Sequence, residues 1–243
     1  MSLDFPASGN ALWALYDATG IRPEYLLPPL YYESGGFRNI QNLQGYPYYG
    51  INQASVDMLS RYGLTPDEYL ALPISEQIRR VVTPEFVGLQ NRYGPIRSGL
   101  RVYQANFLPG TLPIIKTLDG VLAHEGNLNE WNAGNVYGAN AGFDKAHKGT
   151  ITLDDLKNAV TESLATPAVQ SAIKQTYALR PGEMMQDPVY GTDFGPGNLF
   201  QLTPQRLLLV GAAGFIGYTL YTGQLQAWWK KTLPAVRSKL RLA

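Results

Sequence analysis

Residues 31–53, YYESGGFRNIQNLQGYPYYGINQ, combine a single acidic side chain, Glu33, with several tyrosines and side-chain amides. Sugars offer hydroxyl groups that bind amides and apolar ring faces that stack on aromatic side chains. A carboxyl group packed against apolar walls has a raised pKa, so it can remain a general acid near neutral pH. The composition of this stretch therefore favours a cleft for a sugar polymer, with Glu33 as its proton donor.

A purely structural interpretation fits the same residues when order and spacing are ignored. A glutamate beside serine and glycine is common at a helix end, and most carboxylates have no catalytic role. The order of the residues favours a catalytic site over a simple helix end. Two glycines and Phe37 follow Glu33, and a second glycine-led block, residues 50–53 (GINQ), ends twenty positions after Glu33.

Three motifs resemble those of the lysozyme-like lytic transglycosylases, the soluble-lytic-transglycosylase family. They are residues 33–37 (ESGGF), 50–53 (GINQ) and 103–110 (YQANFLPG), and the last resembles the Asn-Phe-Leu-Pro form of phage-encoded members. The resemblance covers residues 21–112, and three motifs in order are more specific than any one alone. The chain departs from the family pattern in three places: the polar loop, Asn52 in place of a methionine, and the proline pair at 28–29.

The resemblance implies a mechanism and a set of site residues. Glu33 protonates the glycosidic oxygen and then acts as base, while the muramic C6 hydroxyl attacks C1 and closes a 1,6-anhydro ring. That route needs neither a second carboxylate nor a cofactor. Ser34 holds the substrate or the glutamate, and Tyr103 bonds to either one or is simply a core tyrosine. The implied substrate-binding residues are Ser34, Gln53, Tyr103, Asn106, Tyr49 and Tyr48.

Two alternatives stay open at this stage. A hydrolytic muramidase needs two carboxylates flanking the scissile bond. The nearest second acid in the sequence is Asp57, which fits the first turn of a helix better. The other alternative is a non-catalytic structural virion or membrane-anchored protein whose lysozyme-like domain only binds glycan. An open groove at Glu33 with Tyr103 and Gln53 facing it favours an enzyme. A Glu33 that is covered by the appendage or paired with an arginine such as Arg38 favours the structural protein.

Composition limits the possible partners. Charged residues make up 16% of the 243 residues and the formal net charge is +1, so the basic stripe expected of a nucleic-acid-binding protein is not indicated. There is no cysteine, hence no disulfide framework or thiolate site. The only histidines, His124 and His147, lack ligand spacing, so we expect no metal site. The first ten residues do not read as a secretory signal.

The pattern predicts a mainly α fold with few strands, because no run alternates with period two. Glycine and proline signals place the ends of most helices. A short helix is expected to start near Pro28, with Glu33 in its last turn and the glycine pair ending it. The other expected helices are 11–19, 23–27, 54–62, one capped by Thr65, 75–82, 84–93, 96–106, 156–164 and 167–179.

Four segments are predicted. They are a lysozyme-like catalytic domain (1–118), a helical appendage (119–180), a Pro/Gly-rich linker (181–205) and a hydrophobic helix with a basic tail (206–243). Within the appendage, residues 144–155 have the frame of a calcium loop. Ala146 and Lys148 replace the expected acids there, so we interpret it as a degenerate EF-hand-like turn that keeps its shape without metal.

Residues 207–229 contain no charged side chain and could span a bilayer as a helix, followed by tryptophans and a basic tail. A buried helix within a protein assembly is the alternative. The positive-inside tendency puts the tail in the cytoplasm and the catalytic domain in the periplasm. The resemblance of residues 103–110 to phage-encoded transglycosylases implies an enzyme of a phage virion that acts in the cell envelope, and such delivery would reconcile this topology with the lack of a secretory signal. Its expected partners are the peptidoglycan glycan strand, other tail or baseplate proteins and the bacterial inner membrane.

Overall fold

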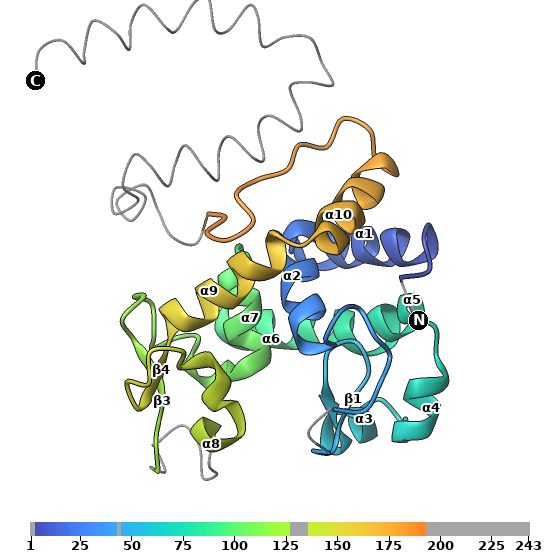
Figure 1. Cartoon of the computed structure of the whole chain (residues 1–243). Helices are drawn as coiled ribbons and strands as arrows, with labels where there is room; N and C mark the ends of the chain where they lie inside the picture. The colour runs from blue at the N-terminus through green and yellow to red at the C-terminus, as the bar shows by residue number, and fades with distance from the viewer. Residues whose placement is uncertain (1–2, 43–44, 127–135, 193–243) are drawn as a thin grey trace, which may run out of the picture. The chain divides into compact units, whose positions relative to one another are not determined.

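Helix α2, Pro23–Glu33, lies near the centre of the fold (Figure 1). The computed structural model describes residues 3–42, 45–126 and 136–192, which belong to one compact unit. All side chains from Pro23 to Leu30 are buried, because helices α1 (Ala7–Thr19), α7 (Gly99–Phe107), α9 (Leu153–Leu164) and α10 (Pro167–Ala178) pack around α2. A helix enclosed in this way holds its last turn in a fixed position, and that turn carries Glu33.

Helix α2 is continuous through Pro28 and Pro29, so the prediction of a new helix starting near Pro28 is wrong. These prolines cannot donate hydrogen bonds to the carbonyls of Glu24 and Tyr25. Both rings are buried in the core, and this packing compensates for the lost bonds. The predicted position of Glu33 in the last turn is confirmed.

The predicted mainly helical character is confirmed, and most predicted helices are present with shifted ends. Helix α1 ends at Gly20, whose φ of 69° is left-handed, as its sequence position predicts. Thr65 caps α4 in a complete capping box. The helices are α1 Ala7–Thr19, α3 Val56–Arg61, α4 Pro66–Ala71, α5 Ile74–Gln77, α6 Thr83–Tyr93, α7 Gly99–Phe107, α8 Val136–Asn140, α9 Leu153–Leu164 and α10 Pro167–Ala178, with 3-10 turns η2 Pro109–Thr111 and η3 Ala141–Phe143.

A π-helical turn, Ile78–Val82, joins α5 to α6, where the sequence predicted two helices separated at Pro84. Proline lacks the N–H that an α-helical turn would use at this point. The backbone N–H and the hydroxyl of Thr83 both donate to the Ile78 carbonyl, the latter at 2.9 Å. The wider turn therefore lets one long helical segment pass the proline.

Two short antiparallel pairs complete the fold. Strands β1 (Tyr48–Tyr49) and β2 (Ala54–Ser55) enclose the glycine-led block, and β3 (Val121–His124) pairs with β4 (Thr150–Thr152). The helix predicted from residue 54 begins only at residue 56, because residues 54 and 55 pair with β1 and the Ser55 hydroxyl caps α3.

The predicted boundary between residues 118 and 119 falls inside the compact unit. Helix α9 packs on α2 and α7, and α10 packs on α1 and α2. Val169, Ala172 and Ile173 of α10 belong to the same hydrophobic cluster as Leu12 and Ile21. The predicted appendage therefore shares its core with the predicted catalytic domain and helps to position α2.

Residues 181–192 of the predicted linker are packed on the same unit. The backbone carbonyls of Pro188 and Val189 accept hydrogen bonds from Gly99 and Leu100 at the start of α7. The backbone N–H of Gln186 donates to the buried Glu24 carboxylate at 2.9 Å. These bonds join the segment to α2 and α7, where the proline and glycine content alone suggested a free linker.

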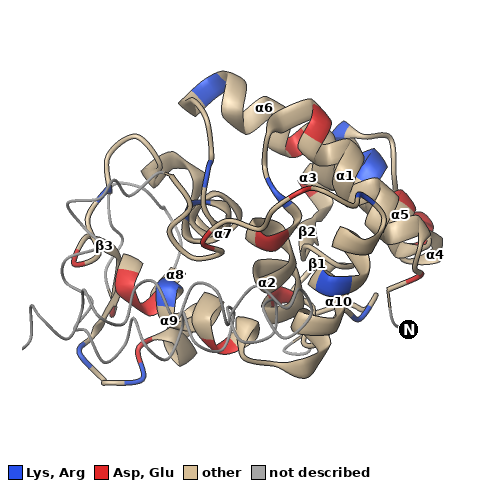
Figure 2. Cartoon of the chain, turned by 90° about the horizontal axis from the view of Figure 1, so that it is seen from above, with Lys and Arg blue, Asp and Glu red and all other residues tan. Residues whose placement is uncertain are grey.

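The predicted hydrophobic helix and basic tail, 206–243, and the remainder of the linker lie outside the described residues. Among the residues that the structure describes, no helix is long and apolar enough to cross a membrane. Figure 2 shows basic and acidic residues interspersed over the described part of the chain.

Candidate active site

Glu33 stands at the carboxyl end of α2, where the chain turns sharply away. The backbone N–H of Ser34 donates to the Leu30 carbonyl at 3.1 Å, and Gly35 and Gly36 follow with φ of 58° and 112°. The glycines supply the left-handed conformations that end the helix. A helix carboxyl end disfavours negative charge, so this position by itself favours the protonated form of Glu33.

Helix α7 presents Tyr103 and Asn106 to Glu33. The two residues are three positions apart, so they share one face of the helix. Both side chains approach the Glu33 carboxyl closely enough to lower its pKa through hydrogen bonding. The Tyr103 hydroxyl is buried and has no well-formed hydrogen bond among the described residues. It is therefore a donor that a small movement of Glu33 can satisfy.

An aromatic cluster forms the apolar wall beside Glu33. Tyr32 stacks on Phe143 with ring centroids 5.2 Å apart, and Tyr103 lies 5.7 Å from Tyr32 and 5.8 Å from Phe143. Phe107 contacts Phe143 edge-on. Phe143 belongs to the predicted appendage, so that part of the chain completes the surroundings of the glutamate.

Burial raises the pKa of Glu33 to about 7, against the opposing effect of Tyr103 and Asn106. None of the ion pairs in the described ranges includes Glu33. Arg38, the candidate partner in the structural interpretation, donates to the Gly35 carbonyl at 2.8 Å instead. Protein atoms surround the carboxyl, yet the residue is only half-buried. The Glu33 carboxyl can therefore exist in both protonation states near neutral pH.

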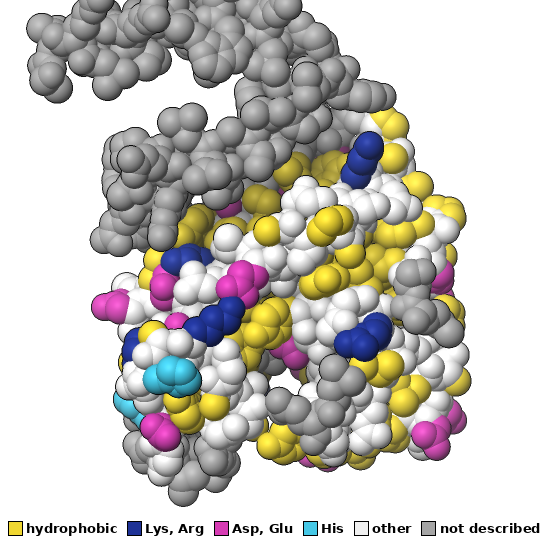
Figure 3. Space-filling view, in the orientation of Figure 1, with side chains coloured by type: hydrophobic (Ala, Val, Ile, Leu, Met, Phe, Trp, Pro, Cys, Tyr) yellow, Lys and Arg dark blue, Asp and Glu magenta, His cyan; other side chains and the backbone are white. Residues whose placement is uncertain are grey.

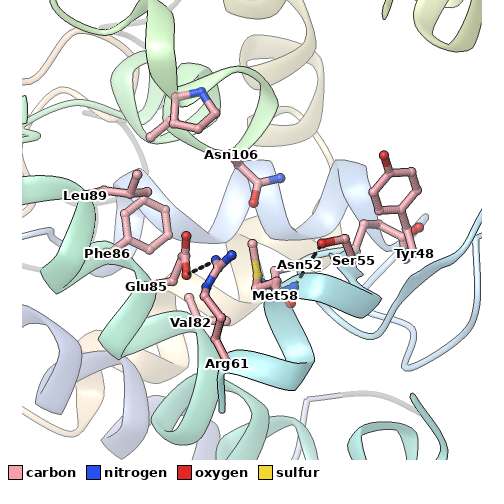
Figure 4. Close-up of a pocket in the computed structure, with 13 residues that line it drawn as sticks. Tyr48, Asn52, Ser55, Met58, Arg61, Val82, Glu85, Phe86, Leu89 and Asn106 are labelled. Atoms are coloured by element: carbon pink, nitrogen blue, oxygen red, sulfur yellow. Dashed lines mark hydrogen bonds and ion pairs between the residues drawn. The ribbon is translucent and has the colours of Figure 1, made fainter. Parts of the chain in front are cut away.

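A cleft of about 290 Å³ lies beside this site (Figure 4). Asn106 lines the cleft and also contacts Glu33, which is not itself a lining residue. The space-filling view shows the surface hollowed between the part over β3 and α8 and the part over β1 and α3 (Figure 3). The cleft is lined by Tyr48, Asn52, Gln53, Ser55, Met58, Arg61, Val82, Glu85, Phe86, Leu89, Ala105, Asn106 and Pro109.

The structure brings three of the predicted substrate-binding residues to this cleft, namely Asn106, Gln53 and Tyr48. Tyr48 is 43% exposed and offers an open ring face. The Gln53 amide is oriented by Asn42 Nδ2, which donates to its Oε1 at 3.0 Å, and by its own donation to the Gly50 carbonyl at 3.1 Å. Amide and aromatic groups therefore meet here, as the sugar-binding prediction requires.

Two other predicted residues, Ser34 and Tyr49, are not among the residues that line the cleft. Ser34 is buried and its hydroxyl donates to the Leu30 carbonyl at 2.7 Å, so it secures the end of α2. Tyr49 packs against the small cluster that contains Leu59 and Tyr69. The sequence could not separate Tyr48 from Tyr49, because neighbouring strand residues point to opposite sides and only one side faces the cleft.

The glycine-led block is fixed by buried polar contacts. Gly50 has φ of 71°, and a Cβ there would lie 2.3 Å from the Tyr69 ring. Tyr69 donates its hydroxyl to Asn52 Oδ1 at 2.6 Å, and Gln77 Oε1 accepts from the Ile51 backbone at 2.9 Å. Asn52, which lines the cleft, is thus held in place by Tyr69.

Sequence reasoning missed Glu85 and Arg61, which come from α6 and α3 and meet in the cleft (Figure 4). Arg61 Nη2 lies 2.9 Å from Glu85 Oε2, and Tyr62 donates its hydroxyl to the same oxygen at 2.8 Å. Burial and Glu85 raise the pKa of Tyr62 to about 12. Glu85 occupies the first turn of α6, where an acid is expected for helix stability, so no local signal marked it.

The predicted degenerate calcium loop is held by groups of the chain itself. Buried Asp144 accepts hydrogen bonds from the backbones of Lys148 and Gly149 and from the Tyr137 hydroxyl. Burial opposes ionisation of Asp144, but these bonds outweigh it and lower its pKa. The Lys148 ammonium lies 2.9 Å from Asp155, the acid at the last loop position. Lysine therefore contacts the carboxylate that would bind calcium in an intact loop.

Comparisons of the chain with protein-family models, with curated proteins and with solved structures find no match.

Proposed function

We propose that this protein cleaves the glycan strands of peptidoglycan as a lytic transglycosylase, with Glu33 as general acid and then general base. The observation that carries the proposal is the environment of Glu33. Its pKa is raised to about 7, no cation in the described residues pairs with it, and Asn106 links it to a cleft of amides and aromatic rings. An acid whose pKa lies near the working pH serves both protonation roles.

The proposed reaction needs only one carboxyl group. Glu33 donates its proton to the oxygen that links C1 of the muramic sugar to C4 of the next sugar, and the C1–O4 bond breaks. The C6 hydroxyl of the same muramic sugar then bonds to C1, and its proton passes to the Glu33 carboxylate. The products are a 1,6-anhydro end and a free C4 hydroxyl, no water is consumed, and Glu33 recovers its proton.

Donors on α7 support these steps. The Tyr103 hydroxyl and Asn106 amide stabilise the Glu33 carboxylate that exists between the two proton transfers, since each bonds better to the charged form. Gln53 and Tyr48 would hold sugar rings in the cleft, Gln53 through its amide and Tyr48 through its exposed face. No cofactor or metal enters the proposed reaction.

A hydrolytic muramidase is the second candidate, because Glu85 places another carboxylate in the cleft. In that reaction Glu85 would activate a water on the opposite face of the sugar. Glu85 Oε2 already accepts hydrogen bonds from Arg61 and Tyr62, which stabilise its charge and make it a weaker base. The transglycosylase route therefore accounts better for the contacts of Glu85.

The proposed setting is a phage virion whose enzyme opens the bacterial cell wall during genome entry. This part of the proposal depends on the resemblance of residues 103–110 to phage-encoded transglycosylases. The proposed partners are peptidoglycan, other tail or baseplate proteins and, through residues 206–243, the inner membrane. A non-catalytic glycan-binding virion protein is the remaining alternative.

Digestion of purified peptidoglycan by the full chain in detergent tests the enzyme proposal. Release of soluble fragments by the wild type, its loss in Glu33→Gln and its retention in Glu85→Gln are the expected results. Loss of release in both variants would move the assignment to the muramidase. A wild type that binds peptidoglycan but releases nothing would leave the non-catalytic alternative.

A further inference from the structure

Arg61 is the basic side chain among the residues that line the cleft, and most of its hydrogen-bonding capacity is free. Its side chain is 56% exposed, against 20% for Glu85. Arg61 Nη2 donates to Glu85 Oε2 at 2.9 Å, the one hydrogen bond of this guanidinium within the described chain. A guanidinium carries five N–H donors in a planar fork, so several remain available to a ligand.

Glu85 occupies one donor of this fork, and the described residues leave the others free. The same carboxylate oxygen accepts from Arg61 and from the Tyr62 hydroxyl, which joins the end of α3 to the start of α6. Figure 4 shows Arg61 pointing into the cleft with Asn106 on the other side. Asn106 in turn faces Glu33, so a ligand that reaches from the reacting carboxyl across the cleft meets Arg61.

We propose that Arg61 binds a carboxylate of the glycan substrate. This inference rests on the proposed function, because the ligand class follows from a muramic-acid polymer. Each muramic sugar carries a lactyl group whose carboxyl is either free or linked to a peptide stem with carboxylates of its own. A planar fork matches a carboxylate in a bidentate arrangement, which a lysine could not reproduce.

The charges of Arg61 and Glu85 determine how much affinity for a carboxylate Arg61 can supply. Arg61 and Glu85 are together neutral, so the pair exerts little long-range attraction on an anion. Affinity then comes from short, directional hydrogen bonds to a charged group. Losing such bonds typically lowers affinity about 10- to 100-fold. Glu85 opposes an incoming carboxylate, so removing its charge should keep or strengthen binding.

The test is calorimetric titration of the full chain in a Glu33→Gln background, in which strands are bound but not cleaved. Three soluble probes are compared: stem-bearing glycan strands, stem-free strands with free lactyl carboxylates, and chitin oligosaccharides, which carry no carboxylate. The variants are Arg61→Gln, Glu85→Gln and, as control, Arg79→Gln. Arg79 is similarly exposed and is also paired with a glutamate, Glu76, but it is not a cleft residue.

We expect Arg61→Gln to lower affinity for stem-bearing strands at least 10-fold and to leave chitin binding unchanged. Glu85→Gln and Arg79→Gln should bind strands at least as well as the parent. An equal loss on stem-free strands identifies the lactyl carboxylate, whereas a loss confined to stem-bearing strands identifies the stem. Both outcomes support the subsite.

Three results would overturn the inference: unchanged affinity in Arg61→Gln, an equal loss on chitin, or an equal loss in Glu85→Gln, which would mean that the ion pair only holds α3 to α6. A separate experiment tests the proposed enzyme activity: it measures release of peptidoglycan fragments by the chain with Glu33 intact. If binding depends on Arg61 but the chain releases no fragments, the carboxylate subsite is supported and the proposed enzyme activity is rejected.

Discussion

Replacing Glu33 with glutamine should abolish activity and, above neutral pH, stabilise the fold. The Glu33 carboxyl has an ordinary pKa of 4.5 and a folded pKa of about 7. The folded chain therefore binds this proton more tightly than the unfolded chain does. The free energy of unfolding must fall as pH rises from about 4.5 to about 7, and it should change no further through this group above that range.

The magnitude follows from the difference of about 2.5 between these two pKa values. At about 1.4 kcal/mol for each pKa unit, the ionised carboxyl destabilises the fold by about 3 kcal/mol at pH 8.5. At pH 5 the corresponding figure is about 1 kcal/mol. Glutamine fills the same space, carries no charge and keeps an acceptor for Asn106. The variant should therefore gain up to about 3 kcal/mol at pH 8.5, or about 6 to 12 °C in melting temperature.

Urea unfolding at pH 5 and pH 8.5, followed by circular dichroism, measures this difference. Glu76→Gln is the matched control, since Glu76 is an exposed partner of Arg79 and its loss should change stability by less than about 1 kcal/mol at either pH. A Glu33→Gln variant that is no more stable than the wild type at pH 8.5 would refute the buried-acid account. A gain of the same size at both pH values would also refute it, because the gain must come from the charge.

Four further predictions concern the surroundings of the site and the folding units beside it. Phe143→Ala should let water reach Glu33, lower its pKa and move the alkaline limb of the pH–rate profile about one unit lower. Tyr103→Phe should move that limb higher, because the hydroxyl lowers the pKa of Glu33, and should change stability by less than about 1 kcal/mol, because the hydroxyl has no well-formed bond to lose. Asp144→Ala should lower the unfolding free energy by about 2 to 4 kcal/mol, whereas a chelator should leave the melting temperature of the wild type unchanged, as thermal scans can check. Gly50→Ala should cost at least about 2 kcal/mol in urea unfolding, since its φ is positive and the added Cβ meets the Tyr69 ring. Movement of the alkaline limb in the opposite direction would contradict the role given to Phe143 or Tyr103. A melting temperature that changes with a chelator would contradict the metal-free Asp144 loop, and an unchanged stability of Gly50→Ala would contradict the close contact with Tyr69.

Local signals predicted the position of Glu33 well. A glycine pair after a helical stretch ends a helix in almost any context, so the last turn of α2 and its carboxyl were visible in the sequence. The same holds for Gly20 and Thr65, whose roles depend only on neighbouring residues. Asn106 and Tyr103 were predicted through the resemblance of residues 103–110 to the transglycosylase motif, and the structure places them on one face of α7.

Contacts between distant segments could not be predicted. Phe143 reaches Tyr32 only because α9 packs on α2 and α7, and nothing in residues 141–143 indicates that packing. Arg61 and Glu85 look like ordinary helix-end charges until α3 and α6 are brought together. The continuity of α2 through its two prolines was missed because core packing outweighs the local cost of a proline.

The central claim is that Glu33 cleaves peptidoglycan without consuming water. Digestion in water enriched in oxygen-18, with mass spectrometry of the released fragments, tests it most directly. The account predicts anhydro-muramic ends that are one water lighter than reducing ends, contain no label and disappear with Glu33→Gln. Labelled reducing ends would contradict the account and assign the chain to the hydrolases.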